Sequence, residues 1–441
     1  MGYSGGADST ALVHLLHSIG VDIVAAHLHH GMRDEADEEM RRCAEFCDSL
    51  GVPIVTGRAD VPRMAKELGV GIEEAGREAR YNFFRQAAFQ TECDWVATGH
   101  TQDDHIETVL FHMARGTGLA GLAGIPEVRE GIIRPLLPFT RAELREYCET
   151  NNFWFHDDPA NSEIDLSRVR LRERVIPEFE KVHPGFRAGI LRLSESAQED
   201  EAFLNGLAAQ ILERAEIQLN GSLNFITRDC EMAFSRAELA HAPDVLRRRA
   251  LRLAVQYLGG KLSYDQADTW SSEILGRDNS SFTSDQPSVI LEIKEDSLTL
   301  RQAAIDQPFR FHLTIPGETE SEVFGWKLVA QDWDVEDYKR IPASLDAVID
   351  REKTKGELFF RSVQDGDKIL PLGGTGHKKI ADIYQEMGLT LAARRRLPII
   401  CDMVGPIWIP GGRMDDRVKI TPQTNRALRL SFEPLHPVQK S

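Results

Sequence analysis

The chain has 441 residues and a formal net charge of −17, with 69 acidic side chains against 52 basic ones. This length favours about two to four domains, and the acidic balance argues against general coating of nucleic acid while leaving local basic stripes open. No stretch approaches the roughly 18 apolar residues of a membrane span, and no basic segment followed by an apolar run stands at the N-terminus. We therefore expect a soluble cytoplasmic protein with no membrane partner.

A glycine-rich turn, SGGADS, occupies residues 4–9. Its glycines let backbone N–H groups approach an anion, and a helix predicted from about Asp8 offers its positive N-terminal end. The run lacks the Lys of the GxxxxGK[ST] loop, so it is not the common P-loop. A carboxylate beside a polyphosphate is repulsive unless a divalent cation lies between them, which makes Asp8 a candidate Mg²⁺ ligand. A glycine-rich turn that only caps a helix is the alternative.

Strand-like and helix-like patterns then alternate over about the first third of the chain. Short apolar runs at 22–30, 52–57 and 94–100 end in polar or glycine residues, and apolar residues recur at helical spacing over 34–51 and 73–90. This alternation predicts an α/β fold, a doubly wound parallel sheet with helices on both faces. Ligands bind such sheets at the carboxyl ends of the strands, where these polar residues lie.

Basic and histidine side chains accompany two of these elements. HLHHGMR at 27–33 ends a predicted strand, and contact with a nucleotide or a polar strand end is favoured there over zinc, because no fourth ligand stands nearby. In EEAGREARY at 73–81, Arg77, Arg80 and Tyr81 share a helix face. Arg80 could neutralise phosphate charge, and surface salt bridging is the alternative.

Acidic side chains gather at the start of another predicted helix, within TGHTQDDHIETVLFHMARGTGLAGL at 98–122. Thr101 is a good N-cap, and Asp103, Asp104 and Glu107 follow at spacings that converge on one face. The helix dipole favours acidic residues at this end, which is the structural alternative. The functional interpretation is a pocket for Mg²⁺ or for the ammonium group of a substrate.

The rest of the chain is predicted as helices followed by short strands. Helical patterns cover 140–206, with a long helix at 186–216, then 233–259 and 263–275; a hairpin follows at 288–302, and one helix at 378–388 lies among later short strands. We expect a mostly helical middle domain and a small α/β C-terminal domain. The predicted domains are 1–205, 206–310 and 311–441.

Three basic clusters stand out against the acidic background, at 168–174, 247–252 and 378–396. Residues 361–441 carry thirteen Lys or Arg against eight Asp or Glu. A single such cluster is usually a solvated helix face, but three of them in an acidic chain favour a polyanionic partner.

Together these motifs resemble one family. SGGADS, HLHHGMR, EEAGREARY, TGHTQDDHIET, RGTGLAGL (115–122), RPLL (134–137) and DDPAN (157–161) occur in the order and rough spacing seen in the tRNA(Ile)-lysidine synthetases. These are bacterial members of the PP-loop, or N-type ATP pyrophosphatase, superfamily. The segments 365–389 and 394–417 also resemble that family's C-terminal domain.

The resemblance implies an ATP-dependent ligase. ATP would adenylate the C2 oxygen of the wobble cytidine in an isoleucine tRNA with a CAU anticodon, releasing pyrophosphate, and free L-lysine would then displace AMP through its ε-amino group. The implied catalytic residues, with Asp8 holding Mg²⁺ and the last two facing the lysine ammonium group, are Asp8, Arg80, Asp104 and Glu107. The implied ATP contacts are Ser4, Gly5, Gly6, Ala7, Asp8, Ser9, His27, His100, Arg115 and Gly116. The implied tRNA contacts are Arg168, Arg170, Arg172, Lys378, Lys379, Arg394, Arg395 and Arg396.

Two positions depart from the family pattern. Val169 stands where the family more often has Asn, so a role for that position in binding RNA is doubtful. Only Met1, Gly2 and Tyr3 precede the SGGADS loop, where the family has a β-strand. We expect the first strand to be missing, and this form to bind ATP more weakly than one extended upstream.

Other functions stay open at this point. A cytidine 2-thiolase of the same superfamily is the nearest, but such enzymes resemble this domain while relying on CxxC cysteines, and the six cysteines here form no such pair. A non-catalytic tRNA-binding protein is a second, against which the intact Asp8, Asp104 and Glu107 argue. The oligomeric state is open too, a homodimer included.

Overall fold

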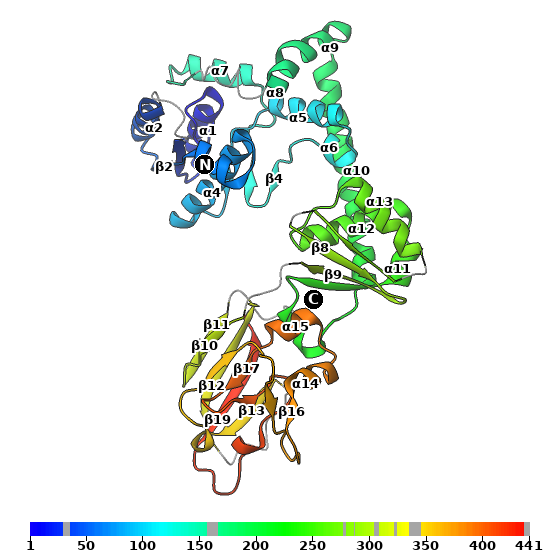
Figure 1. Ribbon diagram of the computed structural model, residues 1–441. Coiled ribbons are helices and arrows are strands. Elements are labelled where there is room, and N and C mark those ends of the chain that lie inside the picture. The colour runs from blue at the N-terminus through cyan, green and yellow to red at the C-terminus, as the bar shows by residue number, and fades with distance from the viewer. Residues whose placement is uncertain are drawn as a thin grey trace. The chain divides into compact units, whose positions relative to one another are not determined.

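The computed structural model describes residues 1–29, 36–156, 166–276, 279–285, 287–303, 308–321, 324–334 and 345–435. The chain forms two compact units, Met1–Phe203 and Leu204–Ser441 (Figure 1). The DDPAN motif at 157–161 and residues 30–33 of HLHHGMR lie outside the described residues. Among the helices described, none is long and apolar enough to cross a membrane.

A mostly parallel sheet forms the centre of the first unit. Strand β1 (Ala25–His29) pairs in parallel with β2 (Ile54–Arg58). Strand β3 (Val96–Ala97) pairs in parallel with β5 (Ile132–Ile133), and β4 (Val128–Arg129) runs antiparallel to β5 at the edge. The predicted doubly wound parallel sheet is confirmed, with an antiparallel strand added at one edge.

The residues that precede the glycine-rich loop join the two halves of this sheet. The Gly2 N–H donates to Ala97 O at 2.8 Å, and the Tyr3 N–H donates to Ala26 O at 2.9 Å. As expected, no strand stands ahead of the loop, but residues 1–3 still pair with both neighbours through these bonds and an isolated bridge between Gly2 and Ala26. A side chain at Gly2 would lie 2.5 Å from the Phe84 ring, so glycine permits this close approach.

The resulting strand order places the loop at a ligand-binding crevice. Across the sheet the order is β2, β1, residues 1–3, β3, β5, β4. The chain therefore leaves residues 1–3 toward one edge of the sheet and later returns to build the other edge. Crevices in open α/β sheets form where the order reverses in this way, and the loops after residues 1–3 and after β3 meet there.

Helices cover both faces of the sheet. On one face lie helices α1 (Ala7–Ser18) and α2 (Ala36–Leu50), whose Val13 and Cys43 pack on Tyr3 and Ala25 of the sheet. Helix α7 (Arg141–Thr150) packs beside α1. On the other face, Phe84 of α4 packs on Ala26. The helices of that face are α3 (Val61–Leu68) and α4 (Ile72–Gln90).

The first unit ends in a helical segment. Its elements are α5 (Gln102–Arg115), α6 (Leu119–Leu122), α8 (Leu166–Arg170), a π-helical turn (Leu171–Val175), α9 (Ile176–Val182) and α10 (Phe186–Ala215). The long helix predicted over 186–216 is confirmed by α10, which begins in the first unit and ends in the second.

The second unit opens with helices packed on a four-stranded antiparallel sheet in the order β6-β9-β8-β7. Its elements are β6 (Glu231–Ser235), α11 (Arg236–His241), α12 (Asp244–Tyr257), α13 (Tyr264–Leu275), β7 (Ser280–Thr283), β8 (Val289–Ile293) and β9 (Ser297–Gln302). The hairpin predicted at 288–302 is confirmed by β8 and β9. The helix predicted from 233 begins only at Arg236, because residues 233–235 belong to β6, and a run that short cannot be told from a strand by spacing alone.

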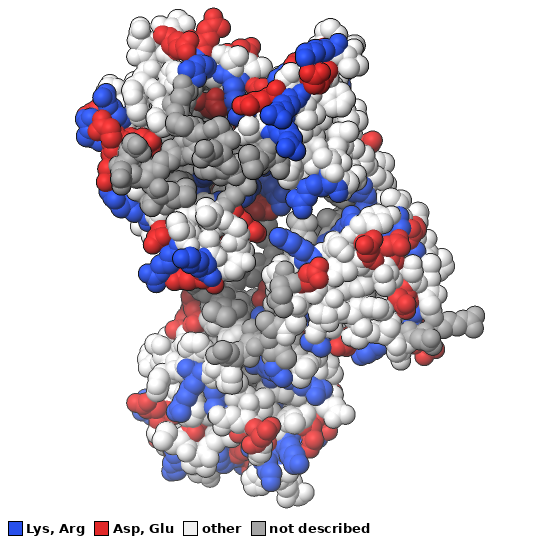
Figure 2. Space-filling view, turned by 45° about the horizontal axis from the view of Figure 1, so that its top comes forward, with Lys and Arg blue, Asp and Glu red and all other residues white. Residues whose placement is uncertain are grey.

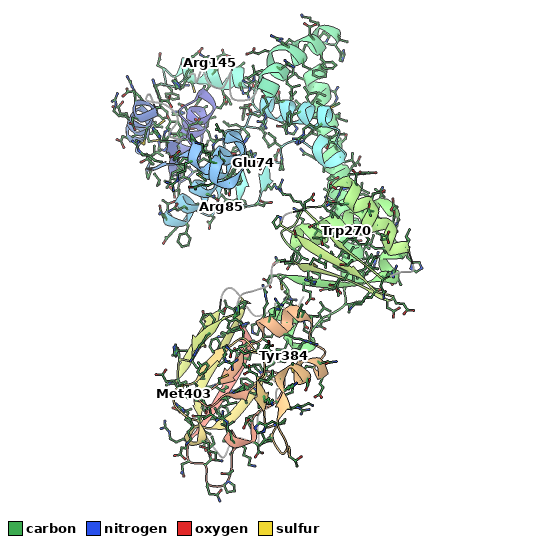
Figure 3. All side chains as sticks on the ribbon, in the orientation of Figure 1. Glu74, Arg85, Arg145, Trp270, Tyr384 and Met403 are labelled. Atoms are coloured by element: carbon green, nitrogen blue, oxygen red, sulfur yellow. The ribbon has the colours of Figure 1, made fainter. Side chains whose placement is uncertain are left out.

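The remainder of the second unit contains two four-stranded antiparallel sheets, β10-β14-β17-β18 and β11-β12-β19-β13. The strands are β10 (Arg310–His312), β11 (Gly317–Ser321), β12 (Trp326–Trp333), β13 (Asp346–Asp350), β14 (Phe359–Arg361), β15 (Lys368–Ile369), β16 (Lys378–Lys379), β17 (Ile399–Cys401), β18 (Pro406–Trp408) and β19 (Ala427–Pro434), and the helices are α14 (Ile380–Glu386) and α15 (Leu391–Arg396). Tyr384 lies in their shared core, whereas Trp270 belongs to the core of the preceding sheet (Figure 3). A domain boundary near 310 stays a prediction.

Candidate active site

The SGGADS loop turns directly into the N-terminus of α1. Gly5 has φ +84°, and a Cβ there would lie 3.0 Å from Cys43 Sγ, so this position requires glycine. Ser9 Oγ donates to Gly6 O at 3.0 Å and accepts from the Ser4 N–H at 3.2 Å, which closes the loop. Gly6 is the N-cap and supplies no side-chain cap, so the first N–H groups of α1 are left for an anion.

Asp8 is a half-buried carboxylate with little compensation. Within the described residues it accepts no hydrogen bond, and its ion-pair partner is Arg141, whose Nε lies 4.0 Å away. Burial and then the neighbouring Asp104 carboxylate raise the pKa of Asp8 to about 6. Its oxygen lone pairs are therefore open to a cation, and Mg²⁺ typically binds through one or two such carboxylates together with phosphates.

The loop that follows β3 touches the SGGADS loop and leads into α5. A Cβ on Gly99 would lie 3.5 Å from the backbone of Asp8 and Ser9, which shows how closely the two loops approach. Thr101 caps α5: its N–H and its Oγ1 both donate to Asp104 Oδ2, at 2.8 Å and 2.9 Å. Asp104 thus completes a capping box with Thr101 at the N-terminus of α5, as an acidic residue with a structural role would. Its other oxygen, Oδ1, pairs with Arg141.

Arg141, at the start of α7, contacts all three carboxylates at the start of α5. Its guanidinium pairs with Asp104 Oδ1 and donates from Nη1 to Glu107 Oε1 at 2.7 Å. Its backbone N–H donates to Asp103 Oδ2 at 2.8 Å. Burial would raise the pKa of Asp104, but Arg141 and the Thr101 donors hold that pKa below its usual range. One arginine therefore contacts three carboxylates of α5 and lies near Asp8.

Two further arginines complete the carboxylate cluster, which we define as Asp8, Asp103, Asp104 and Glu107. Arg172, in the π-helical turn, donates from Nε and Nη2 to the two oxygens of Glu107, at 2.8 Å and 3.1 Å. Arg187, in the first turn of α10, donates to Asp103 Oδ1 at 2.6 Å and to Glu180 at 2.8 Å. Glu107 is only 2 % exposed and both its oxygens are occupied.

The charges of several arginines also act on His100, in the loop that leads into α5. Burial lowers the pKa of His100 to about 4, the Asp104 charge opposes that shift, and Arg134, Arg77 and Arg80 add to it. The imidazole is neutral at pH 7 and shares a 2.9 Å hydrogen bond with Thr98 Oγ1. The site thus combines an open helix N-terminus, acidic groups and basic groups, which suits a substrate carrying both phosphates and an ammonium group.

Comparisons with known proteins agree with this chemistry. Residues 1–179 match the model of the PP-loop domain, and residues 358–431 match that of the TilS substrate C-terminal domain. The chain is 31% identical to the tRNA(Ile)-lysidine synthase of Geobacillus kaustophilus, over 93% of this chain and 90% of that protein. It is 30% identical to the tRNA(Ile)-lysidine synthase of Geobacter sulfurreducens, over 95% and 89%. The chain belongs to the tRNA(Ile)-lysidine synthase family.

Two of the ATP contacts expected for a tRNA(Ile)-lysidine synthase lie away from the cluster. Arg115 is exposed at the C-terminal end of α5, over the Phe111 ring, and Gly116 follows it as the C-cap. At 1.5 Å per residue this end lies about 16 Å along the helix from Asp104. His27 is 4 % exposed, and its Nδ1–H donates to Tyr3 O at 3.0 Å, so it supports the backbone that enters the loop.

The arginines and lysines expected to contact tRNA differ in what the fold leaves exposed. Arg170, Lys379 and Arg395 are exposed, and the side chains of Arg168, Lys378 and Arg394 are partly exposed. Arg396 is 4 % exposed, donates to Ile226 O at 3.2 Å and pairs with Asp229, so the expectation that it contacts tRNA is not supported by its position. Arg172 is likewise engaged with Glu107.

Sequence reasoning missed Arg141 and Arg187 altogether. Both lie at helix N-termini, where the helix dipole disfavours a cation. A basic residue in the first turn of the predicted helix TRAELREYCET was therefore a signal that an acidic partner from elsewhere in the chain would compensate it.

Proposed function

We propose that this member of the tRNA(Ile)-lysidine synthase family joins free L-lysine to C2 of the wobble cytidine in an isoleucine tRNA with a CAU anticodon, at the expense of ATP. The C2 oxygen attacks the α-phosphate and pyrophosphate leaves. The ε-amino group then forms the bond to C2, loses its proton, and AMP leaves with the oxygen. The observation that carries the proposal is the uncapped N-terminus of α1, where Asp8 shares Arg141 as a partner with Asp104 and Glu107 of α5.

The proposed ATP site is the loop from Ser4 to Ser9. Its unbonded N–H groups would donate to the phosphate oxygens, since a helix N-terminus is a ready anion site. Asp8 would hold Mg²⁺, which supplies charge neutralisation at the departing pyrophosphate. Arg80, whose charge reaches His100, would lie on the phosphate side of the same crevice.

The proposed ammonium site uses Asp104 more directly than Glu107. The Asp104 side chain is 20 % exposed, whereas that of Glu107 is 2 % exposed and has both oxygens bonded to arginines. Glu107 would then act through Arg141 and Arg172, holding them in place. A buried charge that has two cationic partners stabilises the arrangement of a site rather than binding a further ligand.

The proposed tRNA contacts are the exposed and partly exposed members of the predicted set: Arg168, Arg170, Lys378, Lys379, Arg394 and Arg395. Figure 2 shows Lys and Arg side chains mixed with Asp and Glu side chains over the face in view, without one continuous basic surface. Phosphate contacts would therefore be made at separate points, and each would contribute a salt-dependent share of the affinity.

The experiment is pyrophosphate release from ATP and Mg²⁺ with a CAU-anticodon transcript and lysine. We expect release over many turnovers only when both lysine and the transcript are present, because without lysine release stops once the transcript is adenylated. Lysidine should be the product by nucleoside mass spectrometry. A transcript with adenosine in place of the wobble cytidine is the matched control and should yield no lysidine. Release that continues unchanged without lysine and RNA would contradict the proposal.

The tRNA contacts are tested separately by binding. Lys379→Gln and Arg395→Gln should each weaken transcript binding about threefold to fivefold and reduce the salt slope by about one. Lys261→Gln is a matched exposed control outside the predicted set. Equal weakening by all three variants would mean that the predicted positions carry no particular role.

A further inference from the structure

Arg141 contacts more of the carboxylate cluster than any other cation in the described part of the chain. Its guanidinium reaches Asp104 and Glu107, its Nε lies 4.0 Å from Asp8, and its backbone N–H holds Asp103. Its side chain is 27 % exposed, so part of it is accessible to a ligand. The sequence motifs did not point to this residue, and the proposed reaction gives it no step.

Charge balance shows what Arg141 does there. Of the four carboxylates, Asp104 and Glu107 pair with the guanidiniums of Arg141 and Arg172, and Asp8 lies 4.0 Å from Arg141. Arg187 divides its charge between Asp103 and Glu180. The cluster therefore keeps a net negative charge. An ammonium group is attracted by that charge and a triphosphate is repelled by it, so the number of cations within the cluster sets the balance between two ligands of opposite sign.

We propose that Arg141 is a specificity-determining positioning residue that sets this balance, leaving enough negative charge to bind the substrate's ammonium group while keeping the crevice open to the triphosphate. The inference rests on the proposed function, since that function supplies both ligands. Arg141 is placed to do this because α7 brings its charge between Asp8 on the phosphate loop and Asp104 on α5.

The proposal predicts opposite changes for the two ligands. Arg141→Gln should bind lysine at least about threefold more tightly and Mg²⁺-ATP at least about tenfold more weakly, because one positive charge is lost close to both. Glu107→Gln should shift both affinities the other way, since one negative charge is lost. The amide oxygen can still accept the bonds that Arg141 and Arg172 donate to Oε1, and only the Arg172 bond to Oε2 is lost. Arg141→Lys, which keeps the charge, should stay within about threefold of wild type for both ligands.

Equilibrium dialysis of labelled lysine and of labelled ATP with Mg²⁺, on the full-length protein, measures these affinities without turnover. Arg145→Gln is the matched control: it lies one turn along the same helix, is labelled in Figure 3, and pairs with Glu149 at 3.0 Å. It should change neither affinity. Melting temperatures of all variants show whether each one folds.

Two outcomes would overturn the proposal. If Arg141→Gln weakens lysine and ATP binding together, Arg141 has a merely structural role; if it changes neither, its charge does not matter to the ligands. Should Arg141→Gln fail to fold, Glu107→Gln decides instead. Weaker lysine binding together with tighter ATP binding would support the proposal, and weaker binding of both ligands would reject it. Failure of the proposed function would appear elsewhere, as wild-type protein that binds ATP but gives no lysine-dependent product.

Discussion

Two carboxylates, the half-buried Asp8 of the first unit and the buried Asp402 of the second, show opposite electrostatics. Asp402 in the second unit has a fully buried side chain and accepts five hydrogen bonds: two from Arg417, at 2.6 Å and 2.8 Å, and three from backbone N–H groups. Burial alone would raise its pKa, but these donors hold the pKa of Asp402 below its usual range. Asp8 in the first unit has one cationic partner among the described residues, at 4.0 Å, and its pKa is raised to about 6.

The difference separates a carboxylate that stabilises the fold from one available to a ligand. Both oxygens of Asp402 accept hydrogen bonds from within the chain, so its charge stabilises the turn at 402–405. Asp8 retains a charge that the chain compensates poorly, which is expected where a ligand completes the compensation. The same contrast distinguishes buried Arg396, paired with Asp229, from the exposed Arg395 beside it.

The largest expected effect comes from removing the satisfied carboxylate. Asp402→Ala leaves the Arg417 guanidinium and three backbone N–H groups without their acceptor, and should lower the free energy of unfolding by about 3 to 5 kcal/mol. Urea denaturation followed by tryptophan fluorescence measures this. Asp365→Ala, at an exposed position of the same unit, should change it by less than about 0.5 kcal/mol. Similar small effects for both variants would show that the hydrogen bonds of Asp402 do not stabilise the fold, and Asp402 would no longer differ from Asp8 in this respect.

The second effect concerns activity rather than stability. Asp8→Asn should lower lysine-dependent pyrophosphate release about 100-fold or more, because the group that would hold Mg²⁺ at the phosphates loses its charge. The melting temperature of the ligand-free protein should not fall, since a poorly compensated charge has been removed. A variant that is active but less stable than wild type would place Asp8 in the same class as Asp402.

The sequence predicted those parts of the site whose residues lie close together in the chain, and missed the pairs between distant residues. The glycine-rich turn leading into a helix, the Thr101 cap and the start of α5 are local patterns, and the structure confirms all three, whereas phosphate binding by the turn stays a prediction. The arginine partners are not local: Arg141 lies 34 residues from Glu107, Arg172 lies 65 from it, and Arg187 lies 84 from Asp103. Spacing along the chain carries no information about such pairs.

The fold was predictable to a similar depth. The alternating patterns indicated the parallel sheet, the long helix and the later hairpin, because each spans enough residues to show a period. Residues 1–3 and residues 233–235 are too short to show one, and only pairing with neighbouring strands identifies their structure. Of the sheet β6-β9-β8-β7, only the hairpin of β8 and β9 was predicted, because β6 and β7 are also too short to show a period.

A third prediction tests whether a satisfied polar group in the first unit behaves as Asp402 does. Ser194 on α10 is 1 % exposed, donates to Ala123 O at 3.0 Å and lies 2.7 Å from His105 Nε2. His105 Nδ1 lies 3.2 Å from the Ile125 N and 3.3 Å from Ile125 O, so Ser194 Oγ is the partner of the other ring nitrogen. Ser194→Ala leaves that buried nitrogen without its partner and should lower the free energy of unfolding by about 1 to 3 kcal/mol.

The matched control is Ser196→Ala, at an exposed position two residues along the same helix. It should be neutral within about 0.5 kcal/mol, measured by the same urea titration. Equal effects from the two serine variants would show that the His105 contact adds no stability, and the distinction between satisfied and unsatisfied polar groups would then hold for the second unit alone.

The smallest effect is the pH dependence that Asp8 confers on stability. Its folded pKa of about 6 exceeds the ordinary value of 3.8, so its charge opposes folding above pH 6 and this opposition fades as the pH falls through 6. In protein free of ATP and Mg²⁺, Asp8→Asn should therefore be more stable than wild type by about 1 kcal/mol at pH 7.5, and the difference should shrink by pH 5. Paired urea titrations at the two pH values measure it. For a carboxylate like Asp402, with a lowered pKa, the native state loses stability only as the pH falls further, so a difference that grows on acidification would assign Asp8 to that class instead.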